Sequence, residues 1–192
     1  MITIDKRLNP DETAILRKMI GRKIVSIMHD AFLNKIFSSH GVVGIETDEK
    51  MIYLYSTIEP LDYYGTGEDV AVWELTDERR CIVGEKNFLS TPVDETVKEI
   101  RIVQENQRMY ENGQQTYDVW VTRGIIFDFG DYQFSLEKSI WFSEIIHMAK
   151  GSDLNDILST FETTEKFVTC DWNEGWDEGI TAECDREIVL LG

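Results

Sequence analysis

The side chains best suited to binding chemistry gather in one stretch, Asp171 to Gly179, which reads Asp-Trp-Asn-Glu-Gly-Trp-Asp-Glu-Gly. Carboxylate and amide oxygens are the hard ligands that calcium prefers. A twelve-residue calcium loop beginning at Asp171 would, however, place Trp176 where the turn needs glycine and Ala182 where a bidentate glutamate belongs. The stretch therefore does not match a calcium-binding loop.

Two other interpretations of this stretch stay open. Its two tryptophans can pack on a sheet while the carboxylates remain in water, which is a purely structural role. Alternatively, exposed tryptophan framed by acidic residues suits a basic protein partner. The second interpretation gives six candidate binding residues: Asp171, Trp172, Glu174, Trp176, Asp177 and Glu178.

Histidine and cysteine are too scattered to predict a metal site. The histidines are His29, His40 and His147, and the cysteines are Cys81, Cys170 and Cys184. Zinc needs three or four such ligands, of which two usually lie close in sequence. No H-x-x-x-H or C-x-x-C pair occurs, so we expect the histidines to satisfy local hydrogen bonds and predict no metal or cofactor.

Motifs for nucleophilic catalysis and nucleotide binding are absent. The sequence contains no G-x-S-x-G elbow, and Cys81 lies in no known cysteine-nucleophile signature. The Gly65-Thr66-Gly67 segment lacks the third glycine and the following helix of a dinucleotide loop, and no Walker sequence occurs. Nucleotide binding is therefore not expected.

An aromatic-rich stretch offers a possible pocket. Its members are Tyr53, Tyr55, Tyr63, Tyr64 and Trp73. Such side chains can line a site for a flat or sugar-like ligand. Aromatic strand residues also commonly pack in a core, so both roles stay open.

Carboxylates on or near expected strands are candidates for acid–base chemistry. They are Glu46, Asp62, Asp128 and Glu144. Paired catalytic carboxylates are recognised by their separation in space, about 5–10 Å, which sequence spacing does not reveal.

The charge balance limits the classes of partner. The chain has 36 acidic and 19 basic residues, which gives a formal net charge of −17. Such a surface repels phosphate backbones and anionic lipid, so nucleic-acid and membrane binding are not expected. The same field promotes solubility and speeds encounter with a basic protein.

Length and composition indicate one globular domain spanning residues 1–192, since 192 residues can bury a substantial core. The N-terminal segment shows no secretory signal pattern, and no run approaches the ~18 apolar residues of a membrane-spanning helix. Three widely spaced cysteines do not form a disulfide framework. We therefore expect a cytoplasmic protein with reduced thiols.

Two helices are expected. Asn9 can cap a helix that starts at Pro10 and stops at Gly21, with Asp11 and Glu12 at the positive end of its dipole. Ser152-Asp153 begins a short second helix, whose apolar residues recur at helical spacing. Those residues are Leu154, Ile157, Leu158 and Phe161.

The remaining pattern is typical of β-strands. Expected strands are Lys23–His29, Val42–Thr47, Met51–Ile58, Val70–Leu75, Val97–Val103, Tyr117–Phe129, Tyr132–Leu136, Ser139–Met148, Phe167–Asp171 and Gly179–Leu191. Residues 48–50 and Asn112-Gly113 predict hairpin turns, and Gly124 predicts a bulge or bend. Pro60 is expected to end its strand, residues 63–69 to form a loop, and residues 79–95 an irregular connection.

This pattern predicts a mainly β protein, an antiparallel open barrel or two-sheet sandwich with an N-terminal helix and a short helix near residue 155. Residues 22–78 and 96–150 each read as a β-meander with similar turns, which either reflects a duplication or arises by chance.

Two functions fit these observations. The first is a non-catalytic interaction module that binds a basic protein, as an immunity-type inhibitor of a cationic toxin would. The alternative is a small-molecule-binding protein or carboxylate-dependent hydrolytic enzyme with a pocket at the barrel mouth.

Overall fold

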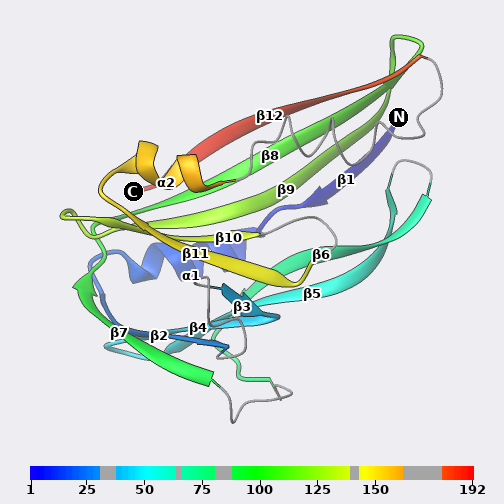
Figure 1. Ribbon diagram of the computed structural model, residues 1–192. Coiled ribbons are helices and arrows are strands. Elements are labelled where there is room, and N and C mark those ends of the chain that lie inside the picture. Colours follow the sequence, from blue (N-terminus) through cyan, green and yellow to red (C-terminus); the bar gives the residue numbers. More distant parts are fainter. Residues whose placement is uncertain (31–37, 64–65, 81–87, 139–142, 162–178) are drawn as a thin grey trace.

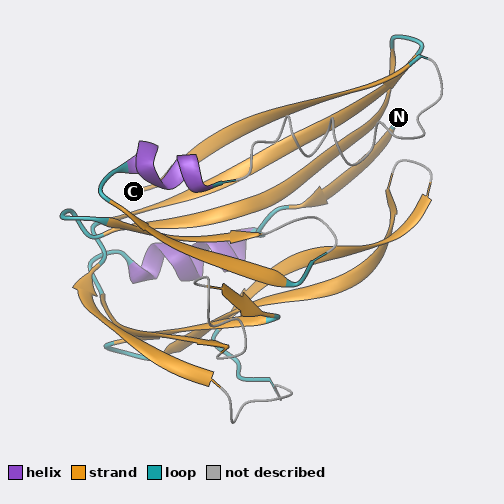
Figure 2. Cartoon of the chain, viewed as in Figure 1, coloured by secondary structure: helices purple, strands orange, loops and turns teal. Residues whose placement is uncertain are grey.

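The computed structural model describes residues 1–30, 38–63, 66–80, 88–138, 143–161 and 179–192. Two β-sheets, almost wholly antiparallel, lie over one another, with one helix at the layer between them and a second helix on the far side of the larger sheet (Figures 1 and 2). The expected mainly β architecture with two helices is confirmed. No described helix has the length and apolarity needed to span a bilayer.

The larger sheet has seven strands in the order β12-β8-β9-β10-β11-β3, and β1 pairs in parallel with β9. Its strands are β1 (Ile2–Lys6), β3 (Ser38–His40), β8 (Glu99–Glu111), β9 (Gln114–Asp128), β10 (Gln133–Lys138), β11 (Ile145–Gly151) and β12 (Ile180–Leu191). Neither β1 nor β3 was predicted, because both are short and β1 is mostly exposed.

The smaller sheet has five strands in the order β6-β5-β4-β2-β7. They are β2 (Lys23–Asp30), β4 (Val42–Thr47), β5 (Met51–Tyr63), β6 (Thr66–Thr76) and β7 (Phe88–Thr96). Strands of residues 22–78 form most of this sheet, and those of residues 96–150 form the middle of the larger sheet. This arrangement tests neither duplication nor chance as the origin of the similar turns in the two segments.

Helix α1 (Pro10–Met19) begins as its sequence predicts. The Asn9 side chain accepts from the backbone amides of Asp11 and Glu12, and one Glu12 carboxylate oxygen accepts from the Asn9 amide at 2.7 Å. The other Glu12 oxygen accepts from the amide of Leu75 on β6 at 2.9 Å. The capping glutamate is buried for this reason, and it ties the helix to the smaller sheet.

The main core lies where α1 and both sheets meet. It includes Leu16, Ile45, Leu54, Ile102 and Phe127. Burial of such side chains is the main favourable contribution to folding.

Helix α2 (Leu154–Thr160) packs on the opposite face of the larger sheet. Ile157 and Phe161 contact Val103 and Ile126 there, which confirms the amphipathic pattern near residue 155. A Cβ at Gly124 would come within 2.5 Å of the Phe161 ring, so glycine permits this close approach.

The turn and the bulge of the larger sheet lie where the sequence predicts them. Asn112 and Gly113 have φ of 50° and 80° at the tip of the β8–β9 hairpin, the conformation that the Asn-Gly pair favours. In the β8–β9 ladder, Val103 pairs with Gly124 and Gln104 with Thr122. The intervening Arg123 is the extra residue of a bulge beside the glycine where a bend was expected.

The prediction that a strand ends at Pro60 is wrong. Strand β5 continues to Tyr63, and β6 already begins at Thr66, within the predicted loop. Only residues 51–55 of β5 pair with β4, so at Pro60 the described strand pairs with β6 alone. A proline without a backbone donor is tolerated at such a locally open edge.

The predicted irregular connection over residues 79–95 is partly wrong, because Phe88–Thr96 forms strand β7. Proline at position 92 and an edge location explain why its sequence does not resemble a strand. The expected strand over residues 139–148 is found from Ile145 onward, and residues 139–142 and the expected strand Phe167–Asp171 lie outside the described residues.

Candidate functional site

Strand β8 carries two polar groups of residues on its opposite faces. Because side chains alternate along a strand, Glu105 lies on one face and Asn106 and Arg108 on the other. Strand β12 extends both groups, since Arg186 pairs with Glu105, and Glu183 pairs with Arg108.

The first group is a buried ion network. Arg186 contacts the Glu105 carboxylate at 2.7 Å, and Arg123 lies 3.8 Å from the same oxygen. Arg123 also contacts Glu137 of β10 at 3.2 Å. The Glu105 side chain is only 2% exposed. Among the described residues, two carboxylates and two guanidiniums contact each other here, and we assign this network a structural role.

Lys138 is a buried cation near that network. Its Nζ donates to the carbonyl oxygen of Ala71 on β6 at 2.7 Å and lies 5.6 Å from the Trp73 ring centroid. The pKa of Lys138 is lowered to about 7, chiefly by burial and secondly by the nearby Arg123, while Glu105 acts in the opposite direction. The hydrogen bond from β10 to β6 links the two sheets.

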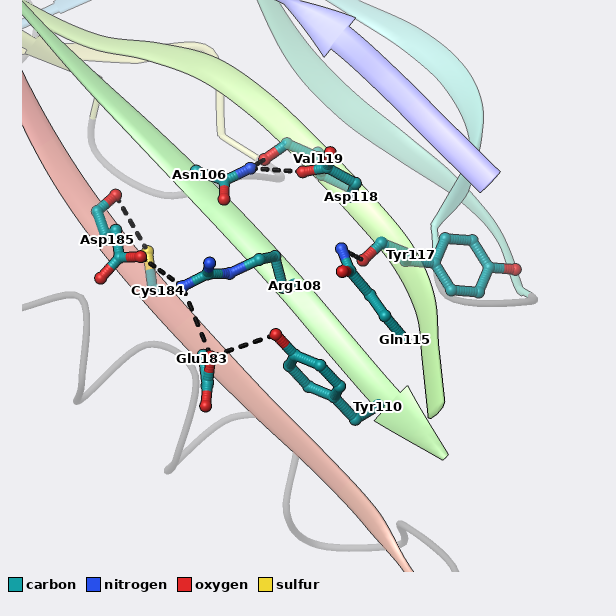
Figure 3. Close-up of polar contacts among 10 residues, drawn as sticks. All are labelled: Asn106, Arg108, Tyr110, Gln115, Tyr117, Asp118, Val119, Glu183, Cys184 and Asp185. Carbon is teal, nitrogen blue, oxygen red and sulfur yellow. Dashed lines mark hydrogen bonds and ion pairs between the residues drawn. The ribbon is translucent and has the colours of Figure 1, made fainter. Parts of the chain in front are cut away.

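The second group forms a surface that we call the acidic face, part of which is drawn in Figure 3. Its carboxylates on β12 are exposed, whereas Asn106 is buried. Its position follows from the register: Trp120 pairs with both Asn106 and Asp5, and Asp118 pairs with Arg108. The acidic face comprises Asp5, Arg7, Asn106, Arg108, Tyr110, Asp118, Trp120, Glu183, Asp185 and Glu187.

Polar contacts organise the acidic face around Arg108. Its guanidinium pairs with Asp185 and lies 3.4 Å from Glu183, and the Tyr110 hydroxyl donates to Glu183 at 3.2 Å (Figure 3). The Asn106 amide donates to the Asp118 carboxylate. These bonds hold acidic side chains at fixed positions above the sheet.

Arg7 and Trp120 form a second centre on this face. The Arg7 guanidinium lies 4.6 Å from the Trp120 ring centroid and donates to both oxygens of Asp5. This hydrogen bonding by Arg7 lowers the pKa of Asp5. The half-buried Trp120 thus already accepts a guanidinium over its ring.

Negative charge is in excess on the acidic face. Five carboxylates, those of Asp5, Asp118, Glu183, Asp185 and Glu187, are opposed by only Arg7 and Arg108. The Asp185 and Glu183 side chains are 71% and 60% exposed. Strand β12 ends the sheet, and no described strand pairs with its outer edge.

A cavity of about 380 Å³ lies between the sheets, on the side where β2 and β7 approach β10 and β11. Ile27, Phe134 and Met148 give it apolar walls. At its rim the Lys150 ammonium lies 3.5 Å from the Tyr132 ring centroid.

The sequence-predicted binding residues are only partly placed. All six candidates of the Trp-bearing turn, Asp171, Trp172, Glu174, Trp176, Asp177 and Glu178, lie outside the described residues, as do Tyr64 and the side chain of Tyr63.

Three of the predicted pocket aromatics are buried, on two faces of the smaller sheet. Tyr53 and Tyr55 stack with their ring centroids 5.9 Å apart and pack with Val42. Trp73 pairs with Ser56 in register and faces the main core on the other side. The structure therefore does not bring these three rings to one common space.

The candidate carboxylates each have their own partners. Glu46 accepts from the Ser26 hydroxyl at 2.6 Å, and Asp62 from the Tyr117 hydroxyl at 3.1 Å. Asp128 accepts from Arg101 and Gln133, and Glu144 lies 3.6 Å from His40.

The histidines occupy separate strands. His29 contacts the Thr91 hydroxyl at 2.8 Å, and His147 contacts the Ser38 hydroxyl at 2.8 Å. Within the described parts of the chain, no group of three or more His, Cys, Asp or Glu side chains could hold a metal ion.

No family model, curated protein or solved structure matches this chain.

Sequence reasoning missed the buried network, the acidic face and the cavity. One local signal was present for the network: Arg123 interrupts an apolar run, and Glu137-Lys138 follows the alternating predicted strand Tyr132–Leu136. A signal for the face was the alternation of Glu183, Asp185 and Glu187 along a predicted strand.

Proposed function

We propose that this chain is a non-catalytic interaction protein that binds a basic protein partner in the cytoplasm, as an immunity-type inhibitor would, and that the acidic face is its binding surface. The observation that carries this proposal is the row of exposed carboxylates on β12, at Glu183, Asp185 and Glu187, along the end of the larger sheet.

Electrostatics favour a cationic partner over other classes. The chain has a net charge of −17, and the acidic face adds a local excess of carboxylates over guanidiniums. Complementary charge raises association rates and disfavours acidic competitors.

Aromatic residues give the face anchoring points. Trp120 and Tyr110 are half-buried members of this face, and tryptophan and tyrosine are enriched among residues that dominate binding energy. The stacking of Arg7 on Trp120 shows that this ring geometry suits a guanidinium. An arginine of the partner can be recognised in the same way.

The edge position of β12 favours an extended segment of the partner. Such a segment can add to a sheet edge through backbone hydrogen bonds, while its alternate side chains face one side. Lysine or arginine at those positions would lie beside Glu183, Asp185 and Glu187. Antiparallel pairing of two β12 strands centred near Asp185 would instead oppose like charges, which is destabilising.

The Trp-bearing turn, which lies outside the described residues, remains a candidate binding segment on the grounds of its sequence. Trp176→Ala combined with Asp177→Lys is expected to weaken capture of the partner without lowering the melting temperature. Unchanged capture would remove this turn from the proposal.

A labelled dodecapeptide of alternating arginine and threonine tests the proposal by fluorescence anisotropy. We expect binding that weakens as salt rises, and no binding of the matching glutamate–threonine peptide. The triple variant Glu183→Lys, Asp185→Lys, Glu187→Lys should abolish binding of the arginine peptide.

The matched control changes the net charge equally at exposed acids elsewhere: Asp48→Lys, Asp69→Lys, Glu78→Lys. The control should keep most of the affinity. Equal losses in both triple variants would show that only overall charge matters and would overturn the acidic face as a binding surface.

A further inference from the structure

The cavity between the sheets has the size of a small-molecule site. Its volume of about 380 Å³ lies within the roughly 300–1,000 Å³ that is usual for ligand pockets. It is formed by residues of both sheets and is separate from the acidic face, which is formed by β1, β8, β9 and β12.

The cavity walls are apolar. Ile27 of β2 and Val93 of β7 contribute from the smaller sheet, and Phe134 of β10 and Met148 of β11 from the larger one. A ligand body that fills this space must therefore be apolar, because a buried polar group without a partner is costly.

Polar groups lie at the rim. Lys150 is exposed, with its ammonium over the Tyr132 ring, and no carboxylate among the described residues forms an ion pair with it. Nearby, His29 and Thr91 hydrogen-bond to each other. The charge of Glu95 contributes to a raised pKa of Tyr132, after burial as the main cause, so one carboxylate also acts on this rim.

The backbone of β7 explains why the cavity is accessible. Ser26 pairs with Pro92 while Ile24 pairs with Glu95, so β7 bulges at residues 93–94, where Asp94 has φ of 60°. Proline and a bulge both prevent an edge strand from pairing further. Among the described strands β7 pairs with β2 alone, which leaves a gap toward β10 and β11.

We propose that this cavity binds a small organic anion with an apolar body, of which a medium-chain carboxylate is the simplest example. The chain lies against Ile27, Val93, Phe134 and Met148, and the carboxylate pairs with Lys150 at the rim. A cationic head group would instead meet the like charge of Lys150.

Isothermal titration calorimetry on the full chain tests this with decanoate, decanol and decyltrimethylammonium below their micellar concentrations. We expect decanoate to bind most tightly, decanol more weakly and the ammonium compound weakest. Binding of none of them, or equal binding of all three, would overturn the proposal.

Two variants locate the site. Lys150→Met should weaken decanoate binding about fivefold and leave decanol unchanged, whereas Lys18→Met on the exposed side of α1 should change neither. Val93→Trp should fill the cavity and weaken both ligands at least tenfold while the protein still unfolds cooperatively. Unchanged affinities in Lys150→Met and Val93→Trp would place binding elsewhere and contradict the proposal.

Discussion

The two faces of strand β8 use charge in opposite ways. On one face, Glu105 joins a buried network whose described members are two carboxylates and two guanidiniums. On the other face, Arg108 lies among carboxylates that outnumber the bases and reach into solvent. Buried charges require balance, because each unpaired ion costs several kcal/mol, whereas exposed charges do not. Unbalanced charge on the exposed face is thus available to a partner.

The largest expected effect comes from a substitution in the buried ion network. Glu105→Gln leaves the guanidiniums of Arg123 and Arg186 without a shared carboxylate, which should lower the free energy of unfolding by about 3–5 kcal/mol. Urea denaturation measures the change. The matched control, Glu183→Gln on the acidic face, should change stability by less than about 1 kcal/mol. Similar losses in the two variants would contradict the assignment of structural and binding roles.

The pH dependence of stability tests the role of the buried Lys138. The pKa of Lys138 is about 7 in the folded protein against an ordinary 10.5, so between these values the unfolded chain binds more protons. Stability should therefore rise with pH from 7 to 9, by at most about 1.4 kcal/mol per unit. Lys138→Met should remove that slope, as measured by urea denaturation at several pH values. A slope that persists in the variant would assign it to other groups.

Trp120→Ala tests peptide binding at the acidic face. The substitution removes the ring beneath Arg7 and should weaken binding of the arginine–threonine peptide about tenfold, as expected for an aromatic anchor. Anisotropy titration measures the affinity, and Tyr132→Ala, at the cavity rim, provides a comparison that should leave it unchanged. An unaffected peptide affinity in Trp120→Ala would remove this ring from the binding surface.

The smallest expected effect concerns the surface ion pairs themselves. Arg108→Met should change stability by less than about 1 kcal/mol, since its partners Glu183 and Asp185 are 60% and 71% exposed and water screens these pairs. The same variant should strengthen peptide binding, because it frees two carboxylates. Thermal unfolding and anisotropy measure the two quantities, and weaker peptide binding would show that Arg108 holds the carboxylates in a required position.

Features governed by neighbouring residues could be predicted from the sequence, and those governed by distant strands could not. The cap at Asn9 and the turn at Asn112-Gly113 depend on local hydrogen bonds and backbone preferences, and both were predicted correctly. Strand β5 continues through Pro60 because of an open edge that only the sheet order reveals.

The candidate site, too, could be predicted from the sequence only where it depends on neighbouring residues. Glu105 and Arg186 are separated by 81 residues in sequence and meet only because β8 and β12 are neighbours. The alternating acids of β12 were visible in the sequence, but their exposure depends on the position of β12 at the end of the sheet. The cavity likewise depends on how far β7 lies from β10 and β11.

Hydrogen exchange of the full chain with and without the arginine–threonine peptide tests the binding surface most directly. Under saturating peptide, we expect slower exchange of backbone amides in β12, with little change in β2, β4 and β7 of the smaller sheet. Saturating peptide that leaves β12 exchange unchanged, or that protects the smaller sheet instead, would contradict recognition of a basic partner at the acidic face.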